Sequence, residues 1–204
     1  MNLPYGPDIS SYPSGHPVGS CSRFKNDAFI WIPKNASGTL RYLFGEDPEN
    51  FYSFDVETYW VFLREPVSRW RSGITEYIYR NPDDHILILD TIHQIEFDEH
   101  TAPQISFLQY RNAYDSGRTN YISIDNKTWL SELINDLGIQ DKEVTVVNDT
   151  IGNKNKTAIG KSVDRVMSPT FINKLREYYS DDIKLLEKTK ETYDTTSCTP
   201  YIVD

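Results

Sequence analysis

The sequence predicts an α/β protein with a mainly parallel sheet of about four to five strands flanked by helices. Two observations support this. Apolar runs that suit buried strands alternate with longer segments of helical periodicity. Two of these runs end in short polar loops that lead directly into a helix. Strands joined through helices lie parallel, and such sheets bind ligands beyond the carboxyl ends of their strands.

Length and composition fit a single globular domain. The chain has 204 residues, of which 38% are hydrophobic and 25% charged. Residues 1–22 are rich in Pro, Gly and Ser and predict an irregular N-terminal arm, so that one domain spans 23–204 with ordered structure from Asp27. The two cysteines lie near opposite ends of the chain, which excludes a zinc site built from cysteines.

Charge and hydropathy restrict the partners. The formal net charge of −9 argues against a bulk electrostatic grip on nucleic acid. The N-terminus lacks the basic and apolar regions of a signal peptide, and no window approaches the roughly 20 apolar residues of a membrane span. We therefore expect a soluble cytoplasmic protein. Oligomeric state is not specified by these properties.

The first strand–loop–helix unit begins at residue 28. The run 28–32 is continuously apolar, which suits a strand buried on both faces, and Pro33 ends it. After the polar loop 34–38, residues 39–44 supply the first turns of a helix that stops near Gly45. The order of elements is therefore strand, tight polar loop and helix N-terminus.

The same order follows once more. The run 59–63 predicts a second buried strand that ends at Arg64. Pro66 occupies a favoured first-turn position, and residues 67–80 have the periodicity of a long helix with Trp70 on its apolar side.

The remaining segments complete the alternation. We expect helices over 84–95 and 127–136, and strands over 119–124 and 143–147. A loop over 100–104 and a polar loop over 148–160 separate these elements. Two helices close the chain, the first capped by Ser168 and the second by Ser180.

The loop from Pro33 to Thr39 has the composition of an anion site. Its small residues allow a tight turn with N–H groups directed inward, and the following helix adds the positive end of its dipole. Lys34 can reach over a bound group and neutralise charge on a leaving oxygen. An ordinary strand-to-helix turn with an exposed lysine explains the same residues. A Walker A loop is excluded, because here the lysine precedes the small residues.

A second cationic motif follows the second strand. Arg64 ends the strand, and Ser72 lies about two helical turns further on. A guanidinium and a hydroxyl that converge can bind one phosphate. A solvated basic helix face is the alternative, but three arginines within eight residues of an acidic protein favour a binding role.

Together these motifs resemble those of sulfotransferases that use 3′-phosphoadenosine 5′-phosphosulfate (PAPS). IPKNASGTL is similar to their 5′-phosphosulfate loop, and FLREPVSRWRSGI to their 3′-phosphate motif, in which a Ser follows an Arg by eight positions. The chain most resembles the carbohydrate-sulfotransferase branch. Further similarities are VVNDT near Asn148, His-x-x-Pro-Gln at residues 100–104, and a Tyr-x-x-Asp centre in SPTFINKLREYYSDDIKLLEK. The resemblance covers about residues 28–190.

The resemblance implies a three-layer fold like that of P-loop NTPases, and direct in-line transfer of a sulfo group from PAPS to a hydroxyl acceptor, in this branch a sugar or glycan. Adenosine 3′,5′-bisphosphate would be the product, and no metal would be required. By position, Lys34 would bind the bridging and sulfonyl oxygens, and Arg64 and Ser72 the 3′-phosphate. The other nucleotide-binding residues of the loop would act largely through backbone N–H groups: Asn35, Ala36, Ser37, Gly38 and Thr39.

One departure from the family pattern is relevant. Gly38 stands where many members have a hydroxyl residue, so one side-chain contact is missing while backbone contacts remain. Late in the chain, the resemblance implies a basic loop that closes over the nucleotide with Lys154 and Lys156. An exposed turn fits that segment equally well.

The catalytic base is the least determined residue. The acceptor hydroxyl loses a proton as the sulfo group arrives, so a His or carboxylate should lie within hydrogen-bond reach. His100, in a loop, is our candidate, since His16 lies in the arm and His85 and His93 lie on a predicted helix. Many relatives carry the base between the two phosphate motifs, where this chain offers only carboxylates: Glu46, Asp47, Glu49, Asp55 and Glu57.

Two other classes of function compete with sulfo transfer. A P-loop-like kinase or nucleotide hydrolase needs a Mg²⁺-binding Ser or Thr after the loop lysine and an acidic strand end. Here Asn35 follows Lys34, and the second strand ends in Arg64. A non-catalytic module that binds a nucleotide or a glycan would keep the binding motifs and lack the base.

Overall fold

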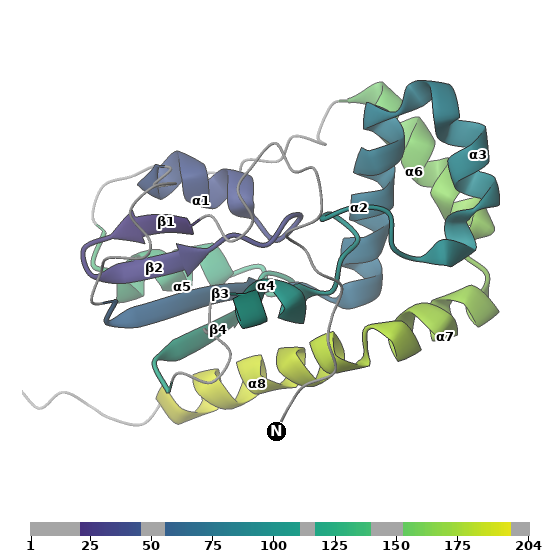
Figure 1. Ribbon diagram of the computed structural model, residues 1–204. Coiled ribbons are helices and arrows are strands. Elements are labelled where there is room, and N and C mark those ends of the chain that lie inside the picture. Colours follow the sequence, from purple (N-terminus) through teal and green to yellow (C-terminus); the bar gives the residue numbers. More distant parts are fainter. Residues whose placement is uncertain (1–20, 46–55, 111–116, 140–152, 197–204) are drawn as a thin grey trace, which may run out of the picture.

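The computed structural model describes residues 21–45, 56–110, 117–139 and 153–196 (Figure 1). Its centre is a four-stranded sheet in the order β1 (Cys21–Phe24), β2 (Asp27–Ile30), β3 (Thr58–Leu63) and β4 (Thr119–Ser123). β2, β3 and β4 are parallel, while β1 is antiparallel to β2. The predicted α/β class with a mainly parallel sheet is confirmed.

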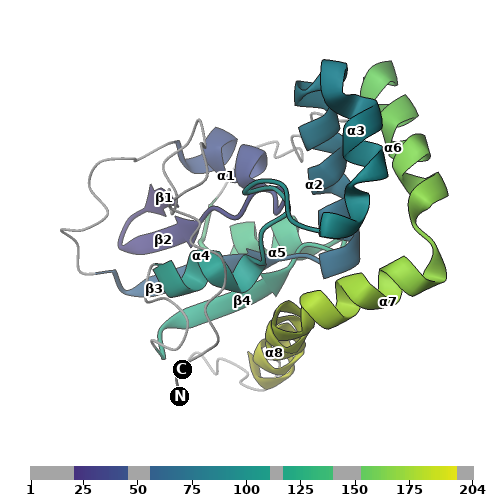
Figure 2. The same ribbon diagram turned by 45° about the vertical axis from the view of Figure 1, so that its right-hand side comes forward.

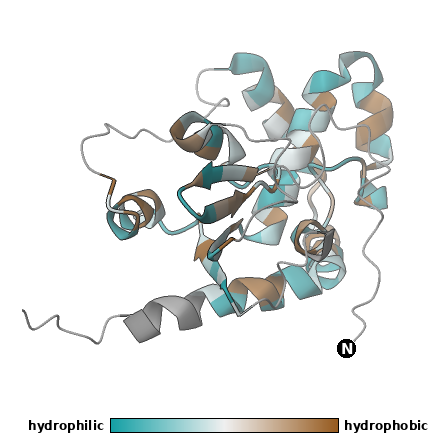
Figure 3. Ribbon diagram, turned by 60° about the vertical axis from the view of Figure 1, so that its left-hand side comes forward, coloured by the Kyte–Doolittle hydropathy of each residue, from teal (hydrophilic) through white to brown (hydrophobic). Residues whose placement is uncertain are grey.

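Helices cover both faces of the sheet (Figures 1 and 2). The strands direct large apolar side chains alternately to the two sides, which buries both. One face packs on α1 (Ser37–Phe44) and α5 (Trp129–Asp136) through Phe29, Trp31, Trp60, Phe62 and Ile122. The other packs on α4 (Gln104–Tyr110) and α8 (Ser180–Thr196) through Ile30, Ile32, Val61, Leu63 and Tyr121. In Figure 3 the strands contain brown, hydrophobic stretches, and the helices around them carry both hydrophobic and hydrophilic residues.

A second group of helices lies beyond the carboxyl ends of the parallel strands. It consists of α2 (Pro66–Arg80), α3 (His85–Asp90), α6 (Lys154–Val166) and α7 (Pro169–Tyr178). These helices share a hydrophobic cluster of their own, which includes Trp70, Ile74, Val163 and Leu175. Figures 1 and 2 both show α2, α3 and α6 side by side. The edge of the sheet where a ligand is expected therefore faces α2 and α6.

The helix starts follow from local chemistry. α2 has Pro66 at its first position, as expected, and its N-cap Glu65 accepts hydrogen bonds from the N–H groups of Val67 and Ser68. Ser168 caps α7 as predicted, and accepts from the N–H of Phe171.

Three expectations about individual elements are wrong. Ordered structure begins before Asp27, because Cys21–Phe24 form β1, whose pairing with β2 is not visible in the composition of the preceding arm. The predicted helix 84–95 is broken into a 3₁₀ turn (Pro82–Asp84), α3 and a second 3₁₀ turn (Ile92–Gln94), and ends at Ile95 with φ 68°.

The third concerns the predicted polar loop 148–160, which is helical from Lys154. Asn153 caps α6 and accepts from the N–H groups of Asn155 and Lys156, and the buried residues Lys156, Gly160 and Val163 lie at helical spacing. The expected strand 143–147 and the segment near Asn148 lie outside the described residues. No helix in the described part of the chain is long and apolar enough to cross a membrane.

Candidate functional site

The loop from Pro33 to Thr39 follows β2 and contains two residues in the left-handed backbone conformation. Lys34 has φ 67° and Ala36 has φ 62°. Turns with residues in this conformation can direct successive N–H groups to one side, as anion-binding loops do. α1 starts at its end, and its N-cap Ala36 supplies no side-chain capping bond. A Cβ at Gly38 would meet no atom within 4 Å, so the loop is open on that side.

Asn35 holds this loop to the sheet. Its side chain is fully buried, and its amide donates hydrogen bonds to the carbonyl of Phe62 at 2.7 Å and to Oε1 of Gln104 at 2.5 Å. Its backbone N–H donates to Ile32. The structure therefore gives Asn35 an internal role, and leaves contact with an anion to its neighbours in the loop.

Gln104 connects the ends of β2 and β3. Its side-chain amide pairs with the backbone of Arg64 in both directions, at 3.0 Å each, as a neighbouring strand would. Asp182, which is buried, accepts from the N–H groups of Gln104 and Ile105 and so caps α4. The hydroxyl of Tyr179 donates to the carbonyl of Thr101. The His-x-x-Pro-Gln and Tyr-x-x-Asp segments of the sequence thus meet in space.

One face of α2 contacts both the Lys34 loop and the turn that carries His100. Arg69, Gly73, Glu76 and Arg80 lie at positions i, i+4, i+7 and i+11 and therefore share one helix face. The Arg69 side chain is 1% exposed, and its guanidinium donates to the carbonyls of Pro33 at 3.0 Å, Ala102 at 2.5 Å and Glu99 at 3.2 Å. The backbone just before Lys34 and the backbone just before His100 therefore meet at one guanidinium.

Gly73 allows the turn that carries His100 to pack closely against the same helix. A Cβ at Gly73 would lie 2.2 Å from the carbonyl oxygen of His100, a separation that no side chain tolerates. Glycine is thus required for this close approach. Together Arg69 and Gly73 place His100 on the face of α2 that also contacts the Lys34 loop.

Glu76 forms ion pairs with three cations. Its Oε2 lies 3.4 Å from Nζ of Lys34 and 2.8 Å from Nζ of Lys156, and its Oε1 lies 2.9 Å from Nε of Arg80. Because the two lysines contact the same oxygen, their ammonium groups are close enough to bind one small anion together. Lys156 is held by α6 and also lies over the ring of Tyr79, 4.8 Å from its centroid.

The electrostatics of this cluster favour an anionic ligand. Burial by itself raises the pKa of Glu76, but the hydrogen bonds and charges of Lys156, Lys34 and Arg80 outweigh it and lower the pKa to about 2. Burial lowers the pKa of Lys34, and Lys156 and Arg64 lower it further, against the opposing charge of Glu76. One carboxylate is shared by three cations, so the cluster retains positive charge in a chain of net charge −9.

The other predicted site residues, and Arg71 beside them, lie outside the ion pairs of Glu76. Arg64 ends β3 and extends over the loop, with Nη1 3.5 Å from the carbonyl of Lys34, and burial lowers its pKa. Ser72 is half-buried on α2, and no hydrogen bond joins it to Arg64 within the described residues. Lys154 is exposed at the start of α6. Arg71 is bound to Asp164 of α6 at 2.5 and 2.6 Å and fastens that helix to α2.

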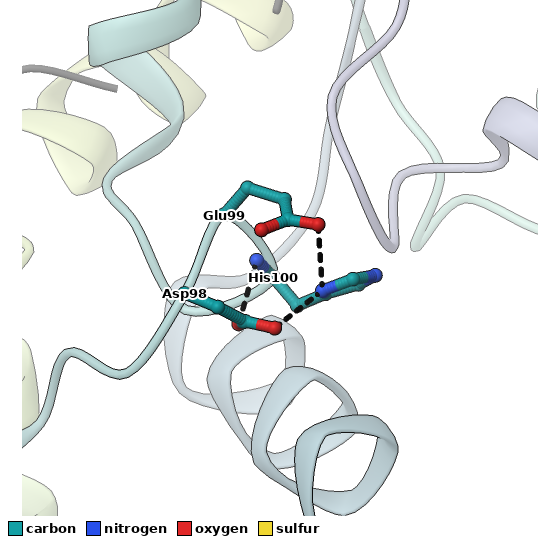
Figure 4. A group of neighbouring side chains, drawn as sticks. All are labelled: Asp98, Glu99 and His100. Carbon is teal, nitrogen blue, oxygen red and sulfur yellow. Dashed lines mark hydrogen bonds and ion pairs between the residues drawn. The ribbon is translucent and has the colours of Figure 1, made fainter. Parts of the chain in front are cut away.

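Among the predicted bases within the described residues, His100 is the least exposed. Its side chain is 10% exposed, and its Nδ1 lies 2.8 Å from Oδ2 of Asp98 (Figure 4). His85 and His93 are exposed. Glu57 is exposed at the amino end of β3, the opposite end from Arg64, so it is wrongly placed for this site. The remaining candidates lie outside the described residues: His16, Glu46, Asp47, Glu49 and Asp55.

Three residues of the site were given no role by the sequence analysis, namely Arg69, Gly73 and Glu76. Their spacing of four and three residues on a predicted helix is the signal that could have revealed them, since it places an arginine, a glycine and a carboxylate on one face. Their partners could not have been foreseen, because they come from distant segments.

Comparison with known proteins adds no assignment. No protein-family model, no curated protein and no solved structure matches this chain at a significant level. Function must therefore be argued from the residues and their geometry.

Proposed function

We propose that the chain is a sulfotransferase that moves a sulfo group from PAPS to a hydroxyl acceptor, in the carbohydrate class, and releases adenosine 3′,5′-bisphosphate. The observation that carries the proposal is the convergence of Lys34 and Lys156 on one carboxylate beside the loop that precedes α1. Two ammonium groups, left-handed loop residues and a helix N-terminus without a side-chain cap are suited to a phosphosulfate group.

Each residue then has a distinct task. Lys34 and the loop N–H groups bind the 5′-phosphosulfate, and Lys34 neutralises the charge that develops on the bridging oxygen as the S–O bond breaks. Lys156 contributes a second positive charge from α6. Arg64 and Ser72 are assigned to the 3′-phosphate on the strength of the sequence resemblance, and Arg64 extends over the same loop.

The same arrangement offers His100 as the group that takes the proton of the acceptor. The acceptor hydroxyl oxygen bonds to sulfur while its proton passes to Nε2 of His100. The electrons of the broken S–O bond remain on the 5′-phosphate oxygen of the product. Arg69 supports this step from a distance, because it binds the backbone on both sides of the site.

Ligand binding tests the proposal directly. Adenosine 3′,5′-bisphosphate should raise the melting temperature and give binding heat in calorimetry, while ATP with Mg²⁺ should have a much smaller effect. Absence of both signals for the bisphosphate at millimolar concentration would refute the proposal. A response to ATP with Mg²⁺ alone would support a kinase or hydrolase.

Two variants separate binding from transfer. Lys34→Ala should abolish sulfo transfer with only a modest loss of bisphosphate affinity, since its main role is at the leaving oxygen. Arg64→Ala should weaken bisphosphate binding itself, by at least tenfold if a charge-assisted contact is lost. Lys174→Ala, on the exposed side of α7, is a matched removal of charge that should change neither quantity.

A further inference from the structure

The turn that carries His100 is held more firmly than a connecting loop requires. Oγ1 of Thr101 accepts from the N–H groups of Phe97 and Asp98, and the N–H of His100 donates to Oδ1 of Asp98 at 2.9 Å. From outside, Arg69 binds the carbonyl of Glu99, and α2 packs on the carbonyl of His100. The imidazole is therefore positioned before any ligand binds.

The two ring nitrogens of His100 have different surroundings. Nδ1 lies 2.8 Å from Oδ2 of Asp98 and 3.5 Å from Oε1 of Glu99. An ionised carboxylate only accepts hydrogen bonds, so in the neutral ring Nδ1 carries the proton and Nε2 carries the lone pair. Figure 4 shows the Nε2 end of the ring directed away from both carboxylates.

We propose that Asp98 is a positioning residue, which holds His100 in the tautomer that leaves Nε2 ready to accept the proton of the acceptor hydroxyl. The inference rests on the proposed function and adds to it the origin of the base. When Nε2 takes the proton, the ring becomes an imidazolium, and the carboxylate of Asp98 stabilises its charge. Asp98 itself touches no reacting atom.

Distance decides between the two neighbouring carboxylates. Asp98 lies at a good hydrogen-bond distance from Nδ1, and it also accepts from the His100 backbone. Glu99, at 3.5 Å, lies outside the range of a good hydrogen bond. Glu99→Gln is therefore a matched control for Asp98→Asn, because both replace an adjacent carboxylate by the corresponding amide.

The tautomer can be measured without any acceptor substrate. Two-bond ¹H–¹⁵N correlation spectra of the histidine-labelled full chain distinguish a proton on Nδ1 from one on Nε2, and His100→Gln assigns the signal. We expect the Nδ1–H form in the wild type and in Glu99→Gln, and the Nε2–H form in Asp98→Asn. A wild-type ring protonated on Nε2, or no change in Asp98→Asn, would overturn the proposal.

Kinetics supply the second readout. With PAPS as the donor and water as the acceptor, the kcat for release of adenosine 3′,5′-bisphosphate and sulfate should fall on the order of 100-fold in Asp98→Asn, with an unchanged KM for PAPS. Equal losses in Glu99→Gln would contradict the assignment. If the wild type fails to bind the bisphosphate, the proposed function fails, and a reversed tautomer with normal binding overturns only the role of Asp98.

The same three side chains could chelate a cation, and the experiment covers this. The ligand atoms of Asp98, Glu99 and His100 lie within 4.8 Å of one another. Titration of the labelled chain with Zn²⁺ should leave the His100 signals unchanged at equimolar metal. Stoichiometric loss or shift of these signals would identify a metal centre and overturn the positioning role.

Discussion

Glu76→Gln tests the electrostatic centre of the site. Glu76 contacts Lys34, Lys156 and Arg80, and its side chain is 9% exposed. The variant keeps the shape of the side chain and removes its charge, so the buried Lys156 and the half-buried Lys34 lose their shared counter-ion. Because a buried cation without a partner is costly, we expect a less stable protein at neutral pH.

The size of the expected stability loss follows from the pKa of Glu76. The pKa of Glu76 falls from an ordinary 4.5 to about 2, and such a difference corresponds to about 3 kcal/mol of stability. Solvent screening at Arg80, whose side chain is 56% exposed, reduces the expectation to about 2 kcal/mol. A depressed carboxyl pKa contributes stability that is fully present above pH 4.5 and is lost as the pH falls toward 2.

Urea denaturation at a series of pH values measures this contribution. The difference in unfolding free energy between wild type and Glu76→Gln should be about 2 kcal/mol at pH 7 and should shrink between pH 4.5 and pH 2. In the variant, bisphosphate should bind more tightly, because no internal carboxylate competes for the lysines. Identical pH dependence in the two proteins, or weaker bisphosphate binding in the variant, would refute this reasoning.

Three further substitutions follow from the contacts. Gly73→Ala should lower the unfolding free energy by more than about 2 kcal/mol in urea denaturation, since its Cβ would lie 2.2 Å from the carbonyl oxygen of His100. Gly38→Ala is the control, and it should leave the unfolding free energy unchanged, because its Cβ would meet no atom within 4 Å. Asp182→Asn should cost about 1–3 kcal/mol in the same assay, because a buried acceptor of two N–H groups is weakened. Arg71→Ala should lower the unfolding free energy by less than about 1 kcal/mol despite its short contacts with Asp164, because both side chains are more than 40% exposed. A larger loss of stability would contradict this and show that the docking of α6 depends on the pair.

Local signals in the sequence were sufficient for most of the elements. Apolar runs ending at Pro33 and Arg64 predicted β2 and β3, because a strand buried on both faces needs such runs. Pro66 and Ser168 predicted helix starts, since capping depends on neighbouring residues alone. β1 and the start of α6 differ from the prediction: the composition of the arm conceals β1, and the lysines and asparagines at the start of α6 have the composition of a loop although Asn153 caps a helix there.

Local sequence patterns are enough to predict the fold class, the two loops at the carboxyl ends of the strands, and the candidates Lys34, Arg64 and His100. Which of these residues meet depends on how the helices pack. Glu76 lies 42 positions from Lys34, and Asp182 lies 78 positions from Gln104. Pairings over such separations leave no local periodicity, because their energies depend on which side chains are buried together when the helices pack. The packing of α6 on α2 also places Lys156 on the same carboxylate as Lys34, and so adds the second ammonium group on which the proposed function depends.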